Sequence, residues 1–189
     1  MPLRPSAAAP LVALIALLAG LGVAQARSAD AERALRTAMS LVDQGLPDAA
    51  LEQLRKARAA APTDMDIERE YVDLMVAEGF GAEVLTETAA RRKAQPENAD
   101  AVYAHGRVLA VAGDLEGARA AFNAALKLSR THHWSLQGLA SLALLEGRSA
   151  DAIDLLKSAA AVAPGRDDIQ NKLAAVHARS GDLPAAYAA

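Results

Sequence analysis

The chain has 189 residues, carries a formal net charge of −3, is rich in alanine and contains 3% aromatic residues, a composition that favours closely packed helices over a β-sandwich. It lacks cysteine, which excludes disulfide bonds, thiolate metal sites and cysteine nucleophiles. Its basic residues are scattered along the sequence, so no basic run predicts binding to nucleic acid.

The first 26 residues have the pattern of an export signal. Arg4 and the amino terminus give a positive start, an apolar run follows, and residues 24–26 (Ala-Gln-Ala) place small residues where a signal peptidase cleaves. We therefore predict a signal peptide over 1–26 and a mature chain that begins near Arg27. The alternative is an uncleaved inner-membrane anchor, because the alanines at 7–9 extend the apolar run toward the ~20 residues that span a bilayer.

From residue 31 onward the sequence repeats every 34 residues without insertion or deletion. A glycine marks each unit, at Gly45, Gly79, Gly113, Gly147 and Gly181. A glycine just after a helix accepts the left-handed conformation that ends it. Prolines at Pro62, Pro96 and Pro164 stop the second half of a unit, because proline lacks the N–H that would continue a helix. Each unit is therefore predicted to be two antiparallel helices.

This pattern places first helices at about 31–44, 65–78, 99–112, 133–146 and 167–180, and second helices at about 47–60, 81–94, 115–128, 149–162 and from 183 onward. Asp114, Ser149 and Asp182 are the predicted N-caps, and Pro47 suits a first helical turn. The predicted domain is one solenoid over 27–189, in which each unit contacts mainly its neighbours. Its units are about 31–64, 65–98, 99–132, 133–166 and a partial 167–189.

Small residues recur near the middle of both helices of a unit, where they let two backbones approach closely. The pairs are Ala38 with Ala50, Gly106 with Ala118, Ala140 with Ala152, and Ala174 with Ala186. The second unit departs from this pattern, because Val84, Thr88 and Arg91 occupy positions that are otherwise small or apolar. We expect this unit to pack less tightly than the others.

These features resemble the tetratricopeptide repeat (TPR) family over about residues 31–189. The third unit is the best match, with Gly106, Gly113, Ala118, Phe122 and Ala125 at the family's positions. The family's aromatic near the start of the first helix is missing in most units. The resemblance implies an all-α, right-handed solenoid of four full units and a partial fifth. It also implies that the first helices line a concave surface that takes a peptide or a partner helix.

One face of the first helices supplies the predicted partner-binding residues. They are Arg69, Asp73, Tyr103, Arg107, Trp134 and Gln137. Two alternatives stay open. Trp134 could instead fill the gap between the third and fourth units, and Arg69 could form only an ion-pair ladder with Asp66 and Asp73 on its own helix. Leu35 and Met39 stand where carboxylate-binding family members have lysine and asparagine, which argues against a chaperone-tail adaptor.

The sequence predicts no catalytic residue, cofactor or metal. His132 and His133 are adjacent and point in different directions, while His105 and His177 fall at packed helix positions. No phosphate-binding loop, zinc-protease motif or nucleophile elbow occurs.

We therefore expect a non-enzymatic scaffold in the bacterial periplasm that serves a cell-envelope assembly, such as polysaccharide export, pilus or secretion-system assembly, or cytochrome maturation. The alternative is the repeat region of a longer envelope enzyme or outer-membrane pore, because the fifth unit stops at Ala189 about seven residues into its second helix. The other explanation of this open end is that it docks on a partner. A third function, carbohydrate binding, would require several aromatic residues in the groove, whereas the sequence offers Tyr103 and Trp134.

Overall fold

The computed structural model describes residues 27–179, which form helices and no strands. The helices are α2 (Ala29–Asp43), α3 (Pro47–Ala60), α4 (Met65–Ala77), α5 (Gly81–Ala94), α6 (Ala99–Val111), α7 (Leu115–Leu128), α8 (His133–Leu145), α9 (Ser149–Val162) and α10 (Asp167–Arg179). Their bounds agree with the predicted ranges to within two residues. Four predictions lie outside the described residues: the signal over 1–26, the glycine Gly181, the cap at Asp182, and the helix from 183 with its small residue Ala186.

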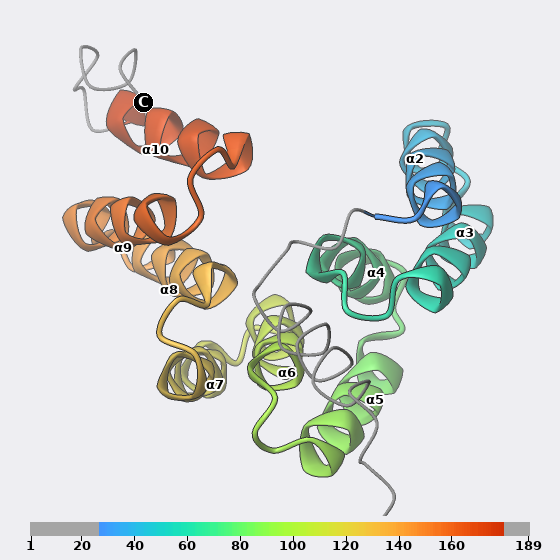
Figure 1. Ribbon diagram of the computed structural model, residues 1–189, viewed down its shortest axis with the longest axis horizontal. Coiled ribbons are helices and arrows are strands. Elements are labelled where there is room, and N and C mark those ends of the chain that lie inside the picture. Colours follow the sequence, from blue (N-terminus) through green and yellow to red (C-terminus); the bar gives the residue numbers. More distant parts are fainter. Residues whose placement is uncertain (1–26, 180–189) are drawn as a thin grey trace, which may run out of the picture.

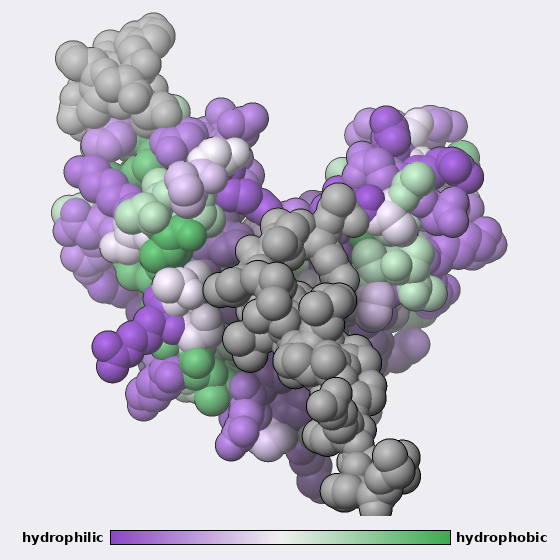
Figure 2. All heavy atoms as spheres, in the orientation of Figure 1, coloured by the Kyte–Doolittle hydropathy of each residue, from purple (hydrophilic) through white to green (hydrophobic). Residues whose placement is uncertain are grey.

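The helix pairs follow one another along an open curve (Figure 1). The pair α2–α3 lies at one end, α6 and α7 at the base, and α9–α10 at the other end, while α4, α6 and α8 lie toward the inside of the curve. Consecutive first helices pack against each other, α4 on α6 and α6 on α8. Figure 2 shows the resulting notch between the two ends, with mainly polar side chains on its walls.

The repeated glycines end the first helices as predicted. Gly113 has a φ of +89°, in the left-handed region that favours glycine. The N–H of the next residue, Asp114, donates to the carbonyl of Leu109 at 2.9 Å, which closes the last turn of α6. Gly45, Gly79 and Gly147 also have positive φ, whereas Gly181 lies outside the described residues.

The repeated prolines follow the second helices. Pro62, Pro96 and Pro164 come shortly after the last residues of α3, α5 and α9. In the third unit Arg130 stands at the equivalent position, and α7 still ends at Leu128. A proline is therefore not required for the helix to stop there.

The helix caps confirm one prediction and correct another. The carboxylate of Asp114 accepts a hydrogen bond from the N–H of Gly117 at 2.9 Å, so it caps α7. Ser149, in contrast, is not a cap: it is the first helical residue of α9, and Arg148 precedes it without a side-chain cap bond. The cap position is the residue directly after the glycine, and Ser149 comes one residue too late.

Small residues lie within three of the helix pairs. Ala50 on α3, Ala118 on α7 and Ala152 on α9 are all fully buried. These three helices make close contact with α2, α6 and α8, the first helices of their own units. Ala38 on α2 and Ala140 on α8, the predicted partners of Ala50 and Ala152, are buried as well. A side chain no larger than a methyl group at these positions leaves room for two backbones to approach closely.

Phe122 occupies the centre of the third unit. A Cβ added at Gly106 on α6 would lie 2.8 Å from the Cβ of Ala121 and 3.0 Å from the ring of Phe122. A Cβ added at Gly138 on α8 would lie 2.7 Å from the same ring. Two glycines on neighbouring first helices therefore make room for one aromatic side chain. The sequence predicted a small residue at Gly106, but as the partner of Ala118, and predicted no role for Gly138.

The second unit is packed differently. Its helices α4 and α5 make far looser contact with each other than the paired helices of the first, third and fourth units, as the sequence predicts, and α5 lies closer to α6. Val84 and Thr88 are nevertheless buried, and the hydroxyl of Thr88 donates to the carbonyl of Val84 at 2.8 Å. The unit is therefore held by its neighbours more than by its own helix pair.

Candidate functional site

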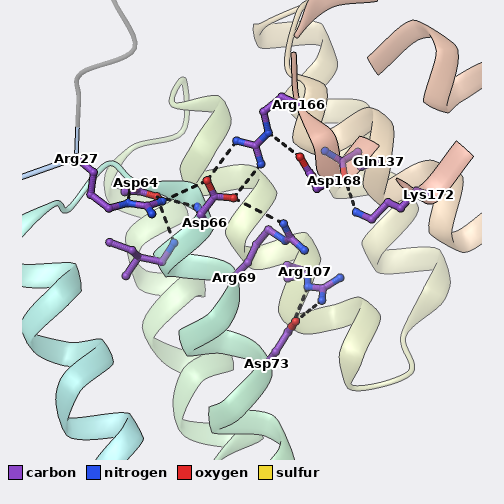
Figure 3. A network of polar contacts seen from close by, with 11 residues as sticks. Arg27, Asp64, Asp66, Arg69, Asp73, Arg107, Gln137, Arg166, Asp168 and Lys172 are labelled. Atoms are coloured by element: carbon purple, nitrogen blue, oxygen red, sulfur yellow. Dashed lines mark hydrogen bonds and ion pairs between the residues drawn. The ribbon is translucent and has the colours of Figure 1, made fainter. Parts of the chain in front are cut away.

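Charged side chains from several units meet on the inner side of the curve (Figure 3). We call them the inner polar network: Arg27, Asp64, Asp66, Arg69, Asp73, Arg107, Gln137, Arg166, Asp168 and Lys172. They come from α4 and the residue that caps it, from α6, α8 and α10, from the segment before α2, and from the turn between α9 and α10. First helices supply most of them, as expected for a surface that the inner helices line.

Asp66, in the first turn of α4, joins distant parts of the chain. Its carboxylate accepts hydrogen bonds from Arg166 at 2.9 and 3.2 Å, although the two residues are 100 positions apart. Arg166 also donates from Nε to Asp168 at 2.8 Å. On the other side of Asp66, the Nη2 of Arg27 donates to the same carboxylate at 3.3 Å. This junction links the start of α2, the start of α4 and the α9–α10 turn across the inner surface.

Asp64, the N-cap of α4, belongs to the same junction. Arg27 donates from Nε to its Oδ2 at 2.7 Å, and the N–H groups of Asp66 and Ile67 donate to its Oδ1. Burial acts to raise the pKa of Asp64, but these hydrogen bonds outweigh it and hold the pKa below its usual value. The ionised carboxylate is therefore the form that the fold stabilises.

Trp134 and Tyr103 are part of the packed interior. Only 6% of Trp134 and 3% of Tyr103 is exposed, and their ring centroids lie 6.5 Å apart. The guanidinium groups of Arg69 and Arg166 lie 4.8 and 4.3 Å from the centroid of the Trp134 ring. These distances allow cation–π attraction. The indole thus supports the arginines of the inner polar network, and its role as an anchor for a partner stays a prediction.

Asp73 pairs between units rather than along its own helix. Its Oδ1 accepts from the Nε of Arg107 at 2.9 Å, and its Oδ2 accepts from Nη2 of the same residue. Asp73 and Arg107 are 34 residues apart, so they hold equivalent positions in successive units. Arg69 pairs with Asp66 at 3.9 Å. The ladder predicted on α4 therefore forms only in part, because Asp73 bonds to α6.

Lys172, on α10, stands out for its charge environment. Its Nζ donates to the amide oxygen of Gln137, and it makes no ion pair with a carboxylate within residues 27–179. The pKa of Lys172 is lowered to about 8, mainly by burial and also by the nearby charges of Arg69 and Arg107, which act against the opposing effect of Asp168. Gln137 itself is buried. The inner surface therefore has a local excess of positive charge.

Two of the histidines, His132 and His105, have local structural partners. His132 caps α8, since its Nδ1 accepts from the N–H of Ser135 at 3.2 Å, and its Nε2 lies 3.0 Å from Asp100. His105 lies 3.3 Å from the hydroxyl of Thr88. Over the described range 27–179, no three histidine or carboxylate side chains converge as a metal site would require.

The sequence predicted which helices form this surface, but it did not predict Lys172 and Arg166, which connect them. Arg69, Asp73, Tyr103, Arg107, Trp134 and Gln137 do lie together, as their shared face predicts. Lys172 could have been found, because it lies one turn after Asp168 on the face already considered. Arg166 could not have been found in this way, because it lies in a turn and no position of the repeat predicts its contact with Asp66.

The fold is that of an α-helical solenoid built from repeated helix pairs. Residues 81–133, which span α5 to α7, match the sequence model of the tetratricopeptide repeat family. No curated protein sequence matches this chain.

Solved structures share this fold at low sequence identity. A thermophilic TPR protein of Thermus thermophilus is 20% identical, over 84% of this chain and 87% of that one, with a TM-score of 0.60. The PilF protein of Pseudomonas aeruginosa is 15% identical, over 86% and 74% of the two chains, with a TM-score of 0.54. A chain of the APC/C hetero-tetramer Cut9–Hcn1 is 18% identical, over 94% and 33%, with a TM-score of 0.65. At these identities the similarity establishes the fold alone.

Proposed function

We propose that this protein is an exported TPR scaffold that binds a peptide or helix of a protein partner on its inner surface, as part of a cell-envelope assembly. The inner polar network carries the proposal. It gathers side chains of α4, α6, α8 and α10 on one concave face, where a single extended segment contacts several units at once.

The chemistry of this face favours a polar partner segment. Arg69, Asp73 and Arg107 are partly exposed and carry both signs of charge, so a bound segment can exchange hydrogen bonds with them. Trp134 and Tyr103 form the support beneath them rather than an open apolar pocket. We propose that Arg69, Asp73 and Arg107 contact the partner and that the buried Trp134, Tyr103 and Gln137 support them from below.

The envelope location is proposed from the sequence. The signal pattern over residues 1–26 supports export. Of the helices in the described range 27–179, none has the length and apolar character needed to cross a bilayer. A chain of similar fold occurs in the Cut9–Hcn1 hetero-tetramer, which supports the use of this architecture in protein complexes. Polysaccharide export, pilus or secretion-system assembly and cytochrome maturation are the assemblies that we propose to examine first.

Binding to the inner surface can be tested with purified mature chain that starts at Arg27. The chain is immobilised and used to capture proteins from an envelope extract, beside the double variant Arg69→Gln/Arg107→Gln and the control Arg55→Gln, which changes an exposed arginine on α3. We expect the control to retain the captured proteins and the double variant to lose them. Equal capture by all three would contradict the proposal. Mass spectrometry of the exported protein tests cleavage after residue 26.

A further inference from the structure

The outer helices leave two grooves on the side away from the inner polar network. The first outer groove lies between the ends of α3 and α5, has a volume of about 370 Å³, and is lined by Arg58, Glu68 and Arg91 among others. The second outer groove lies between α5 and α7 over α6 and has a volume of about 640 Å³. Its lining includes Arg92, Lys93, Val102, His105, Lys127 and Leu128.

In the first outer groove, two carboxylates of the same chain neutralise Arg58. Arg58 lies 4.0 Å over the ring of Tyr71, donates from Nε to Glu68 at 2.9 Å and donates from Nη2 to Glu87 at 2.7 Å. Glu68 is buried and also pairs with Arg91 at 3.3 Å. A buried carboxylate is tolerated here because two guanidinium groups surround it.

The 34-residue repeat allows a position-by-position comparison with the second outer groove. Arg92 is the equivalent of Arg58, and His105 is the equivalent of Tyr71. The two carboxylates have no counterpart: Val102 stands in place of Glu68, and Ala121 stands in place of Glu87. The second outer groove therefore keeps the arginine and its ring neighbour but lacks both anions.

Further cations surround Arg92. Lys93 and Lys127 hold equivalent positions in the last turns of α5 and α7, and Arg130 follows where the other units have proline. Across the described part of the chain, none of these four residues forms an ion pair. Arg92 and His105 line the same groove, and the charge of Arg92 adds to burial in lowering the pKa of His105.

The stabilising effect of a cation at the C-terminal end of a helix does not by itself account for Lys93 and Lys127. A lysine in a last turn complements the helix dipole. However, α3 and α9 have Ala59 and Ala161 at the equivalent position, so the helix pair forms without a lysine there. Between the cations, Val102, Ala124 and the partly exposed Leu128 form an apolar floor.

We infer that the second outer groove binds an acidic peptide segment of a protein partner. One carboxylate of the segment contacts Arg92, as Glu68 contacts Arg58 in the first outer groove. A second carboxylate contacts Lys93 or Lys127, and an apolar side chain packs on Leu128. The surface lies on the opposite side of α6 from the inner polar network and does not depend on the function proposed for that network.

The test uses a fluorescein-labelled peptide of sequence Glu-Glu-Leu-Phe-Glu-Glu and a matched peptide with glutamine at every glutamate position. Fluorescence anisotropy with the mature chain measures both affinities at low and high salt. We expect binding of the glutamate peptide only, weakening as salt increases because exposed charges are screened. Equal binding of the two peptides, or binding of neither, would overturn the inference.

Variants locate the site. Arg92→Gln should weaken binding about fivefold, as for loss of one partly exposed charge pair. Ala89→Glu places a carboxylate three and four residues before Arg92 and Lys93, on an exposed position of α5, and should weaken binding by internal pairing. Lys157→Gln, on α9, is the control and should bind normally. Arg69→Gln/Arg107→Gln should also bind normally, which separates this site from the inner surface.

Two competitors identify the ligand class. Neither 10 mM inorganic phosphate nor an oligothymidylate should displace the peptide, because the groove combines its cations with an apolar floor and lacks an exposed aromatic ring. Displacement by phosphate alone would show a general anion site, and tighter binding of the oligonucleotide would show a nucleic-acid site; either result overturns the inference. Circular dichroism melting confirms that each variant is folded.

Discussion

The second and third units use the same spacing of helices and glycines but are held together by different forces. In the third unit, Phe122 packs between Gly106 and Gly138, and α6 lies close to α7. In the second unit the equivalent of Phe122 is Thr88, α4 lies loosely on α5, and Glu68 bonds to Arg58 of the unit before. A repeat can therefore retain its place in a solenoid after its own pair loosens, provided that contacts to its neighbours replace the lost packing.

Truncation of Phe122 is the most severe test of this comparison. Phe122→Ala removes a fully buried aromatic side chain and should lower the free energy of unfolding by ~3–5 kcal/mol. Thr88→Ala changes the equivalent position of the second unit. The Thr88 hydroxyl bonds within α5 and lies next to the His105 ring, so its removal should lower the free energy of unfolding by about 1 kcal/mol. Urea denaturation followed by circular dichroism measures both. Equal losses would show that the two units are packed alike.

Removing Glu68 tests how the second unit is tied to the first. Glu68→Ala leaves Arg58 and Arg91 without the carboxylate that they share and should lower the free energy of unfolding by about 3 kcal/mol. Glu83→Ala, at an exposed position of α5, is the control and should change it little. A small effect at Glu68 in urea denaturation would mean that the loose unit does not rely on charge.

Ala118 in the third unit can be replaced by valine, the residue that the second unit has at the equivalent position, Val84. Both side chains are fully buried at equivalent positions, in α7 and α5. Ala118→Val should overpack the α6–α7 pair and lower the free energy of unfolding by ~1–3 kcal/mol. Hydrogen exchange should show the loss of protection in α6 and α7. If protection there is unchanged, close packing at Ala118 does not distinguish the third unit.

A pH titration provides the finest comparison, because His105 in the third unit stands where the second has Tyr71. Burial and the charge of Arg92 lower the pKa of His105, so the folded state disfavours its protonation. As pH falls below about 6.5, the unfolded chain takes up this proton more readily, and the free energy of unfolding decreases. We expect His105→Tyr to reduce this decrease between pH 7.5 and pH 5 in urea denaturation. An unchanged pH dependence would assign it to other groups.

Local signals were sufficient for the fold but only partly for the candidate site. Gly113 and Asp114 fix a helix end and a helix start through their own backbone and side-chain bonds, so the sequence predicts both. The sequence did not predict a role for Gly138, because a glycine is required there only by the close approach of Phe122 from another helix. The pairing of Asp73 with Arg107 was missed for a similar reason: a same-helix partner was available, and only the stacking of α4 on α6 decides between them.

The bond between Asp66 and Arg166 has a mechanical consequence. An ordinary solenoid behaves as a chain of nearest neighbours, so its ends can fray one unit at a time. Here the Asp66–Arg166 bond connects the second unit to the end of the fourth, so the units from the second to the fourth form a closed loop of contacts. Bending that widens the notch must break this bond, so we expect the curvature of the array to depend on ionic strength.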